Sequence, residues 1–319
     1  MIHPAAIAEA HARIAPYIVR TPLLESEALN AQLGGRVLFK FEGFQKTGAF
    51  KLRGALNALL SLKEQGALPE RVVAYSSGNH AQAVAYAAKL LSVRATIYIP
   101  GFSSPYKIAA TRAHGAEVVV TETRDAAEQA CQREVENGAV LIPPFDSDLI
   151  IAGQGTSCFE ALQDGPSPDV IFATIGGGGW ISGTWLAAQL LSPRSMVIGA
   201  EPAAVNDAAR SFRSGEIHRF ASMPETIADG ARTPSIAPRT FAYIRQLQDV
   251  MEIDEATIID WTRQLAMQLK ITAEPTSAVA AAACARWFAD TANRGKTALV
   301  MLSGGNIDPA TQARIWSAG

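Results

Sequence analysis

The side chain with the clearest chemical potential is Lys51, which lies among apolar residues in the segment Gln45 to Ala55. An amine removed from water holds its proton less tightly, and a neutral amine is both a nucleophile and a base. For a single lysine, however, the simpler explanation is a side chain that keeps its ammonium group in water. Lys51 therefore becomes a catalytic candidate only if other segments supply partners for it.

A run of glycines directly follows the apolar segment 170–175 and consists of Gly176, Gly177, Gly178 and Gly179. Glycines let the backbone approach an anion and point N–H groups at it, and a helix that begins there adds a favourable dipole. A flexible turn explains the glycines equally well. The GxGxxG spacing of dinucleotide sites is absent, because neither register of the run has a glycine at the last position. The run therefore predicts a phosphate-binding loop of another kind.

A third candidate is a polar turn after the apolar run 72–75, made of Ser76, Ser77, Gly78, Asn79 and His80. It brings hydroxyl, amide and imidazole groups to one place. The side chain of Ser77 or Asn79 could also cap the helix expected over 80–91, and capping is compatible with a functional role.

A fourth candidate consists of two carboxylates six positions apart, Glu201 and Asp207, with the backbone carbonyl of Val205 between them. Oxygen donors of this kind suit Mg²⁺ or Ca²⁺, with water completing the coordination. A solvated acidic turn explains the same pattern more simply. From spacing alone, both interpretations stay open.

The elements that must position these residues alternate between short β-branched runs and longer Ala-rich stretches, which predicts an α/β fold with mainly parallel sheets. The runs expected to be strands are 72–75, 95–99, 118–120, 139–142, 170–175, 197–200 and 298–302. Helices are expected over 80–91, 105–113 and 125–136. Ligands of open α/β sheets bind outside the carboxyl ends of strands, and three of the candidates directly follow such ends.

Composition limits the possible partners. The chain has 319 residues, 48% of them hydrophobic, and a net charge of -2, which favours a folded protein and gives no field that attracts nucleic acid or an anionic membrane. No apolar run approaches the roughly 18 residues of a membrane span. Three widely separated cysteines, Cys131, Cys158 and Cys284, favour a reducing, cytoplasmic compartment. A small-molecule partner is expected.

Taken together, the segments resemble the fold-type II pyridoxal-phosphate enzymes, in particular the serine/threonine dehydratase and serine racemase group with its hydroxyaspartate dehydratase-like branch. The resemblance runs from about Thr21 to Pro309. Five segments match in order: Gln45 to Ala55, Ser76 to Gln82, Gly153 to Thr156, Gly176 to Gly183, and Ser303 to Asn306.

This resemblance implies a tryptophan synthase β-like architecture of two three-layer αβα domains, with the cofactor in the cleft between them. Residues 1–70 and 147–319 would form the large cofactor-binding domain, and residues 71–146 a small domain that closes over the substrate. A homodimer is also expected from the family.

The resemblance also implies a role for each candidate residue. Lys51 would hold pyridoxal 5'-phosphate as a Schiff base, Gly176–Gly179 would bind its phosphate, and Phe50 would lie beside its ring. Asn79 would bond the 3′-oxygen and Ser303 would face the pyridine nitrogen. The turn from Ser76 to His80 would receive the substrate carboxylate. Glu201, Asp207 and the Val205 carbonyl would bind Mg²⁺, or else Ca²⁺ or Mn²⁺, as a structural or activating ion.

A neutral hydroxyl at Ser303 is a weak partner for a protonated pyridine nitrogen, which favours prompt loss of a β-leaving group. We therefore expect β-elimination of threonine, serine or 3-hydroxyaspartate to a 2-keto acid and ammonia, with Lys51 taking the Cα proton. The alternative is a serine or aspartate racemase that uses Lys51 and Ser77 on opposite faces of the cofactor. A cofactor carrier without turnover and a dinucleotide-dependent oxidoreductase rank lower.

Overall fold

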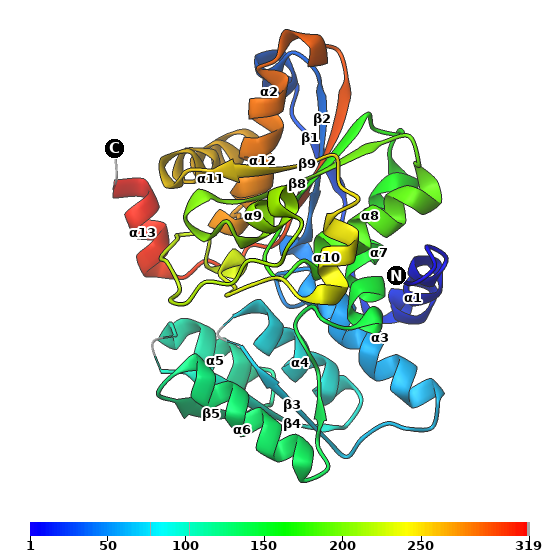
Figure 1. Cartoon of the computed structure of the whole chain (residues 1–319), viewed down its shortest axis with the longest axis vertical. Coiled ribbons are helices and arrows are strands. Elements are labelled where there is room, and N and C mark those ends of the chain that lie inside the picture. Colours follow the sequence, from blue (N-terminus) through cyan, green and yellow to red (C-terminus); the bar gives the residue numbers. More distant parts are fainter. Residues whose placement is uncertain (77, 102, 318–319) are drawn as a thin grey trace.

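A computed structural model describes residues 1–76, 78–101 and 103–317, which form two β-sheets flanked by helices (Figure 1). In this part of the chain the larger sheet has six strands in the order β1-β2-β10-β7-β8-β9, and β1 alone runs antiparallel to its neighbour. Its strands are β1 (Leu23–Glu25), β2 (Arg36–Phe41), β7 (Val170–Thr174), β8 (Met196–Pro202), β9 (Asp249–Ile253) and β10 (Thr297–Leu302).

The smaller sheet is parallel throughout, in the order β5-β4-β3-β6. Its strands are β3 (Arg71–Tyr75), β4 (Arg94–Pro100), β5 (Glu117–Thr121) and β6 (Val140–Leu141). Every strand expected from the sequence is present, so the predicted α/β fold with mainly parallel sheets is confirmed. Strands β1, β2 and β9 were not predicted.

Helices cover both faces of the larger sheet, as the burial of alternate residues requires. Val37 and Phe39 pack in a different core cluster from Leu38, which lies between them on β2. The first cluster includes residues of α2 (Glu27–Leu33), α11 (Glu255–Leu269), α12 (Pro275–Phe288) and α13 (Pro309–Ser317). The second includes residues of α1 (Ala6–Ile14), α7 (Asp148–Asp164), α8 (Gly179–Leu191), α9 (Asp207–Ser214) and α10 (Pro238–Ile244).

The smaller sheet is also covered on both sides. Val72 and Ala74 of β3 pack with α4 (Asn79–Leu90), beside which α5 (Pro105–Ala113) lies. Val73 points the other way, toward α6 (Arg124–Glu136). Short 3-10 turns complete the described elements: η1 (Ala15–Tyr17), η2 (Glu42–Phe44), η3 (Ala203–Val205), η4 (Asp229–Ala231) and η5 (Thr291–Asn293).

Helix α3 (Lys51–Glu64) joins the two halves, because it packs against both α7 and α4. Its approach to α7 depends on Gly153, where a Cβ atom would lie 2.5 Å from the carbonyl oxygen of Arg53 and 2.8 Å from the Cα atom of Gly54. Any side chain at Gly153 would push the two helices apart. The close packing therefore fixes the first turn of α3, which begins with Lys51.

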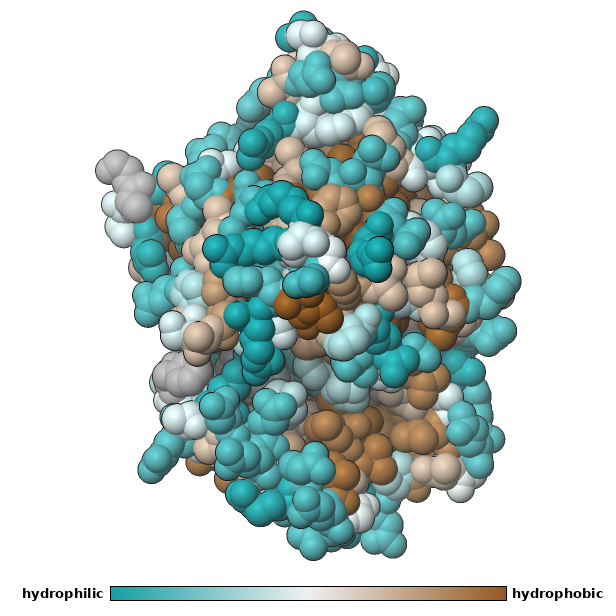
Figure 2. Space-filling model, viewed as in Figure 1, coloured by the Kyte–Doolittle hydropathy of each residue, from teal (hydrophilic) through white to brown (hydrophobic). Residues whose placement is uncertain are grey.

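The surface carries mixed polarity. On the face shown in Figure 2, hydrophilic residues cover most of the molecule, and a group of hydrophobic residues lies in the lower part, over the elements of the smaller sheet. None of the helices in the described ranges has the length and apolar character that a membrane crossing requires.

Candidate active site

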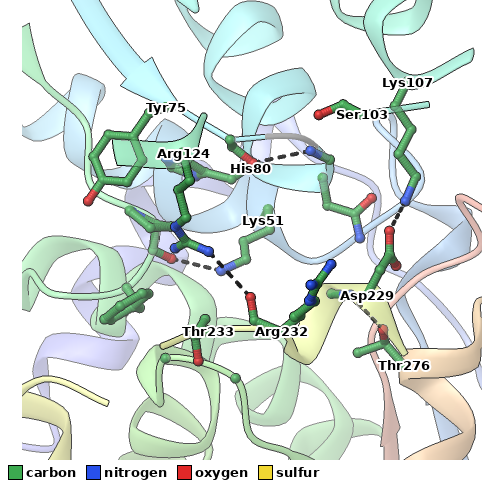
Figure 3. A pocket seen from close by; sticks show the side chains of 18 of the residues that line it. Lys51, Tyr75, His80, Ser103, Lys107, Arg124, Asp229, Arg232, Thr233 and Thr276 are labelled. Carbon is green, nitrogen blue, oxygen red and sulfur yellow. Dashed lines mark hydrogen bonds and ion pairs between the residues drawn. The ribbon is translucent and has the colours of Figure 1, made fainter. Parts of the chain in front are cut away.

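A cavity of about 630 Å³ lies between the two sheets, where the carboxyl ends of β3, β7 and β10 meet. Its volume is typical of small-molecule sites. The structure brings nearly all predicted cofactor and substrate residues to its lining: Phe50, Lys51, Ser76, Gly78, Asn79, His80, Gly176, Gly177, Gly178, Gly179 and Ser303. Ser77 is outside the described residues. Figure 3 shows Lys51 in the middle of this cavity, with residues of both halves around it.

Lys51 is held at the start of α3, where its Nζ donates a hydrogen bond to the carbonyl oxygen of Pro144 at 2.8 Å. Burial lowers the pKa of its amine to about 8, while the negative charge of Glu274 acts in the opposite direction. A much larger share of this amine is neutral at physiological pH than for a lysine in water. Lys51 therefore has the character of a nucleophile and base.

The glycine loop connects β7 to α8 and has unused hydrogen-bond donors. Within the described residues, the N–H groups of Gly176, Gly177 and Gly178 donate to no protein acceptor. Gly178 has a φ of 90°, which side chains rarely adopt, and a Cβ at Gly177 would lie 2.1 Å from the ring of Phe145. Free N–H groups at the beginning of a helix fit a phosphate group.

Ser303 follows β10 and donates its hydroxyl proton to Glu274, with 2.6 Å between Oγ and Oε1. Asn79 donates from Nδ2 to Oε2 of the same carboxylate at 2.9 Å. Glu274 is 2% exposed, and burial raises its pKa while these two hydrogen bonds lower it. Sequence analysis missed Glu274. Its position before Pro275 marks a helix start but does not show that the carboxylate is buried beside Ser303.

The polar turn that includes Ser76 and His80 is stabilised by hydrogen bonds to the protein. The hydroxyl oxygen of Ser76 accepts a hydrogen bond from the N–H of Gly78 at 3.2 Å. His80 is 3% exposed and its Nε2 lies 2.8 Å from the carbonyl oxygen of Ile142. Burial, together with the charge of Lys51, lowers the pKa of His80 to about 3. Its ring is therefore neutral and ties α4 to the segment after β6.

An aromatic wall closes one side of the cavity. The rings of Phe50 and Trp180 stack with 4.2 Å between centroids and 10° between planes. The Nζ of Lys51 lies 5.0 Å from the centroid of Phe50. Phe50 thus presents an apolar surface directly beside the reactive amine.

Charged side chains that sequence analysis missed also line the cavity. Lys107 of α5 forms an ion pair with Asp229 of η4, which links the smaller sheet's helices to the larger half. Arg124, the first residue of α6, donates to the carbonyl oxygen of Arg232 at 3.4 Å. Arg232 donates to the carbonyl oxygens of Met223 and Pro224. These residues come from α5, from α6 and from η4 with the residue that follows it, so no single local pattern in the sequence groups them.

The predicted metal ligands lie elsewhere, at the end of β8 and the start of α9. Glu201 and Asp207 are each 1% exposed and form no salt bridge with any described residue. The Glu201 carboxylate accepts N–H groups of Ala208 and Ala209, and Asp207 accepts that of Ile236. Burial raises the pKa of both, and their mutual repulsion raises that of Glu201 further. No cluster of three or more acidic, histidine or cysteine side chains occurs in the described ranges. Two unpaired buried carboxylates nevertheless fit a divalent cation.

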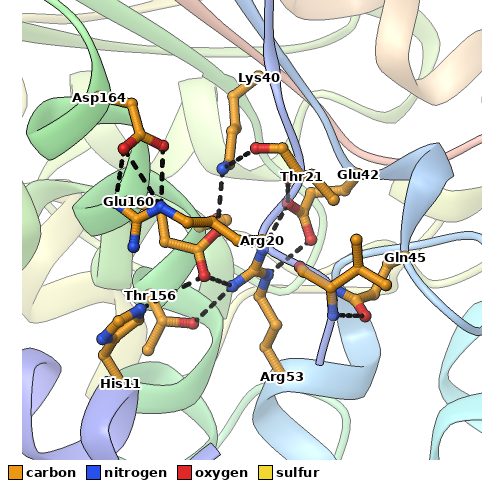
Figure 4. A network of polar contacts seen from close by, with 12 residues as sticks. His11, Arg20, Thr21, Lys40, Glu42, Gln45, Arg53, Thr156, Glu160 and Asp164 are labelled. Atoms are coloured by element: carbon orange, nitrogen blue, oxygen red, sulfur yellow. Dashed lines mark hydrogen bonds and ion pairs between the residues drawn. The ribbon is translucent and has the colours of Figure 1, made fainter. Parts of the chain in front are cut away.

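A buried charge network anchors α3 to the larger half of the molecule (Figure 4). Arg53 donates to the carboxylates of both Glu42 and Glu160 at 2.6–2.9 Å, and Lys40 donates to Glu160 at 2.9 Å. Thr21 donates to Glu42 at 2.7 Å. The two cations and two carboxylates balance one another, and together they connect β2, α3 and α7.

Comparison with known proteins adds independent evidence. The family model for pyridoxal-phosphate dependent enzymes matches residues 14–304. The chain is 41% identical to L-threo-3-hydroxyaspartate ammonia-lyase of Saccharomyces cerevisiae over 98% of this chain and 95% of that protein. It is 38% identical to serine racemase of Schizosaccharomyces pombe over 95% of this chain and 93% of that protein.

Solved structures give a similar result. A threonine deaminase from T.th. is 42% identical, with a TM-score of 0.90 over 96% of this chain and 99% of that one. Maize serine racemase is 37% identical, with a TM-score of 0.92 over 99% of this chain and 97% of that one.

Proposed function

The chain belongs to the pyridoxal-phosphate dependent enzymes, and we propose that it is an ammonia-lyase that converts β-hydroxy L-amino acids to 2-keto acids and ammonia. Ammonia-lyases and deaminases among its relatives support this activity. The observation that carries it is the desolvated amine of Lys51, which lines one cavity with a glycine loop that has free N–H groups. β-Elimination needs such a base for the Cα proton.

The residues of the cavity fit the cofactor. Gly176–Gly179 would bind its phosphate, Asn79 and Ser303 its ring oxygen and ring nitrogen, and Phe50 one side of the ring. Pyridoxal phosphate supplies an electron sink for the charge that develops at Cα. Lys51 would hold the cofactor and, once released from it, take the Cα proton at Nζ. The turn 76–80 would bind the substrate carboxylate.

Residues 71–146 would act as a small unit that closes on the substrate and excludes water from the reacting atoms. The four-stranded sheet, whose strands lie between Arg71 and Leu141, supports this boundary. The ion pair between Lys107 and Asp229 would help to hold the closed arrangement.

Two arginines favour a substrate with a second carboxylate, 3-hydroxyaspartate among the three candidates. Arg124 and Arg232 both line the cavity, and neither forms a salt bridge within the described residues. The hydroxyl oxygen of Thr233 is buried beside them and has no partner in that same set. A guanidinium group pairs with a carboxylate in preference to the hydroxyl or methyl group of serine or threonine.

The competing reaction is racemisation of serine or aspartate, and the serine racemases among the relatives keep it open. A steady-state assay with each candidate amino acid separates the two. Keto acid without D-isomer supports the lyase, whereas D-isomer that appears faster than keto acid would contradict it.

Covalent attachment at Lys51 is tested directly by absorption spectroscopy. The cofactor-supplemented protein should show an imine chromophore, and the Lys51→Ala variant should lack it. A Lys63→Ala variant changes a lysine near the far end of α3 and should keep it. An unchanged chromophore in Lys51→Ala would remove the basis of the proposal.

Mg²⁺, or else Ca²⁺ or Mn²⁺, would bind to the carboxylates of Glu201 and Asp207 and the carbonyl of Val205. Two buried carboxylates without a cationic partner support this, because a divalent cation would neutralise them. The ion would stabilise the connection from β8 to α9 and take no part in the chemistry.

A homodimer and a cytoplasmic location remain predictions. All three cysteines are free and buried, in keeping with a reducing compartment. Light scattering coupled to size-exclusion chromatography tests the dimer.

A further inference from the structure

Glu274 is a buried carboxylate to which the proposed reaction gives no role. It lines the cavity, is 2% exposed, and forms no salt bridge with any residue that the structure describes. A carboxylate in such surroundings is stabilised mainly by the hydrogen bonds it accepts. Its two side-chain donors, Asn79 and Ser303, are the residues expected at the oxygen and the nitrogen of the cofactor ring.

The proton of Ser303 is committed to this carboxylate. A hydroxyl has one proton, and an ionised carboxylate can only accept. The distance of 2.6 Å between Oγ of Ser303 and Oε1 of Glu274 is that of a charge-assisted bond, about 2.5–2.7 Å. The hydroxyl oxygen of Ser277 is farther away, at 3.1 Å, and also bonds the backbone of Gly304. Ser303 therefore has a lone pair, and no proton, left for a group in the cavity.

The amide of Asn79 is oriented in the same way. Its Nδ2 donates to Glu274 at 2.9 Å, and its Oδ1 accepts from Nδ2 of Asn306 at 2.9 Å. The same Nδ2 also lies 3.2 Å from Oε1 of Glu274, so one N–H directed at the carboxylate can serve both of its oxygens. An amide nitrogen has two N–H groups, which leaves the other one for the cavity. Asn79 can thus offer a donor to the cavity, while its acceptor oxygen is already used.

We propose that Glu274 is a positioning residue for the cofactor ring. By accepting their hydrogen bonds, Glu274 orients Asn79 to present an N–H donor to the ring and Ser303 to present a lone pair. This inference rests on the proposed function. A ring oxygen that meets a donor binds best without its proton, and a ring nitrogen that meets a lone pair binds best with one. Through Ser303, the carboxylate of Glu274 then favours a protonated ring nitrogen, whereas a neutral hydroxyl alone would not.

The charges around Glu274 come from several elements. Lys107 of α5 lowers the pKa of Glu274 and Asp229 of η4 raises it. Glu274 in turn raises the pKa of Lys51. Removal of its charge should therefore lower the pKa of Lys51 even without cofactor, which provides a readout separate from catalysis.

The ring nitrogen can be observed in the holoenzyme with cofactor labelled by ¹⁵N at that atom. The wild-type signal should be that of a protonated nitrogen. In Glu274→Gln the new amide can donate to Ser303 and free its proton, so the signal should move toward that of an unprotonated nitrogen. Glu274→Asp should restore part of the wild-type signal. Equal signals in wild type and Glu274→Gln, or an unprotonated nitrogen in the wild type, would overturn the proposal.

Two further measurements isolate the effect. In a Ser303→Ala background, Glu274→Gln should cause no additional shift, because the relay is already broken. The pKa of Lys51 in cofactor-free protein can be measured by NMR after ¹³C reductive methylation. It should fall in Glu274→Gln. It should stay unchanged in the control Asp125→Asn, which alters an exposed carboxylate at the same cavity. An unchanged Lys51 pKa in Glu274→Gln also contradicts the proposal. Absence of the imine chromophore at Lys51 in the cofactor-supplemented wild type would instead contradict the proposed function.

Discussion

Arg53 and Glu160 form a bidentate ion pair, with distances of 2.9 Å from Nη1 to Oε1 and 2.8 Å from Nη2 to Oε2. Arg53 is fully buried and Glu160 is 1% exposed. Arg53 follows Lys51 by two positions on α3, and Glu160 belongs to α7. The pair therefore anchors the helix turn that carries the reactive amine to the larger half of the molecule.

Replacement of Arg53 by Met should destabilise the protein by about 3–5 kcal/mol, because it leaves buried carboxylates without their partner. Urea unfolding measures this free energy. Arg36→Met is the matched control, because it breaks the exposed pair between Arg36 and Glu25 and should cost at most about 1 kcal/mol. Similar losses of unfolding free energy in both variants would show that the buried network stabilises the protein no more than an exposed ion pair does.

Lys51→Met should stabilise the cofactor-free protein at pH 7. The pKa of Lys51 is lowered from 10.5 to about 8 on folding, so the charged amine is a penalty of at most about 3 kcal/mol below pH 8. Between pH 8 and 10.5 the unfolded chain binds more protons than the folded one, and wild-type stability should rise with pH. The advantage of Lys51→Met should shrink over this range, as denaturant unfolding at several pH values can measure. A difference independent of pH would contradict the lowered pKa.

Arg124→Gln should raise the KM for 3-hydroxyaspartate by about 10–100-fold, the value of one hydrogen-bonded charge pair of about 1.5–3 kcal/mol. The KM for serine should change little, because serine has no second carboxylate. Arg133→Gln removes an exposed arginine from the same helix and serves as the control. Equal changes for both substrates would argue against a carboxylate-binding role for Arg124.

Removal of divalent cations with EDTA should lower the melting temperature of the holoenzyme, and Mg²⁺ should restore it, because the cation neutralises two buried carboxylates. Asp207→Asn should lose most of this response. Glu252→Gln alters a nearby carboxylate outside the proposed ligand set and should retain it. Indifference of the wild type to both EDTA and Mg²⁺ would remove the metal proposal.

The sequence alone determined those elements that form from patterns of neighbouring residues. β-Branched runs between glycines and prolines predicted the central strands, since such residues form strands wherever both faces are buried. The edge strands β1 and β9 were missed because β1 has only three residues and because Asp249 and Glu252 interrupt the apolar pattern of β9. The resemblance to the fold-type II enzymes, carried by five segments in order along the chain, pointed to Lys51, the glycine loop and Ser303. The glycine loop and Ser303 directly follow predicted strands.

Tertiary structure decided what depends on the meeting of distant elements. Glu274 is close to neither Asn79 nor Ser303 in sequence, and only the tertiary fold brings the start of α12 to both, so that its carboxylate accepts hydrogen bonds from both. Arg124 and Arg232 likewise meet because α6 faces the loop after η4 across the cavity. Burial and charge at such meeting points set the pKa of Lys51 and the direction of each hydrogen bond, and neither quantity is a property of a residue's neighbours along the chain.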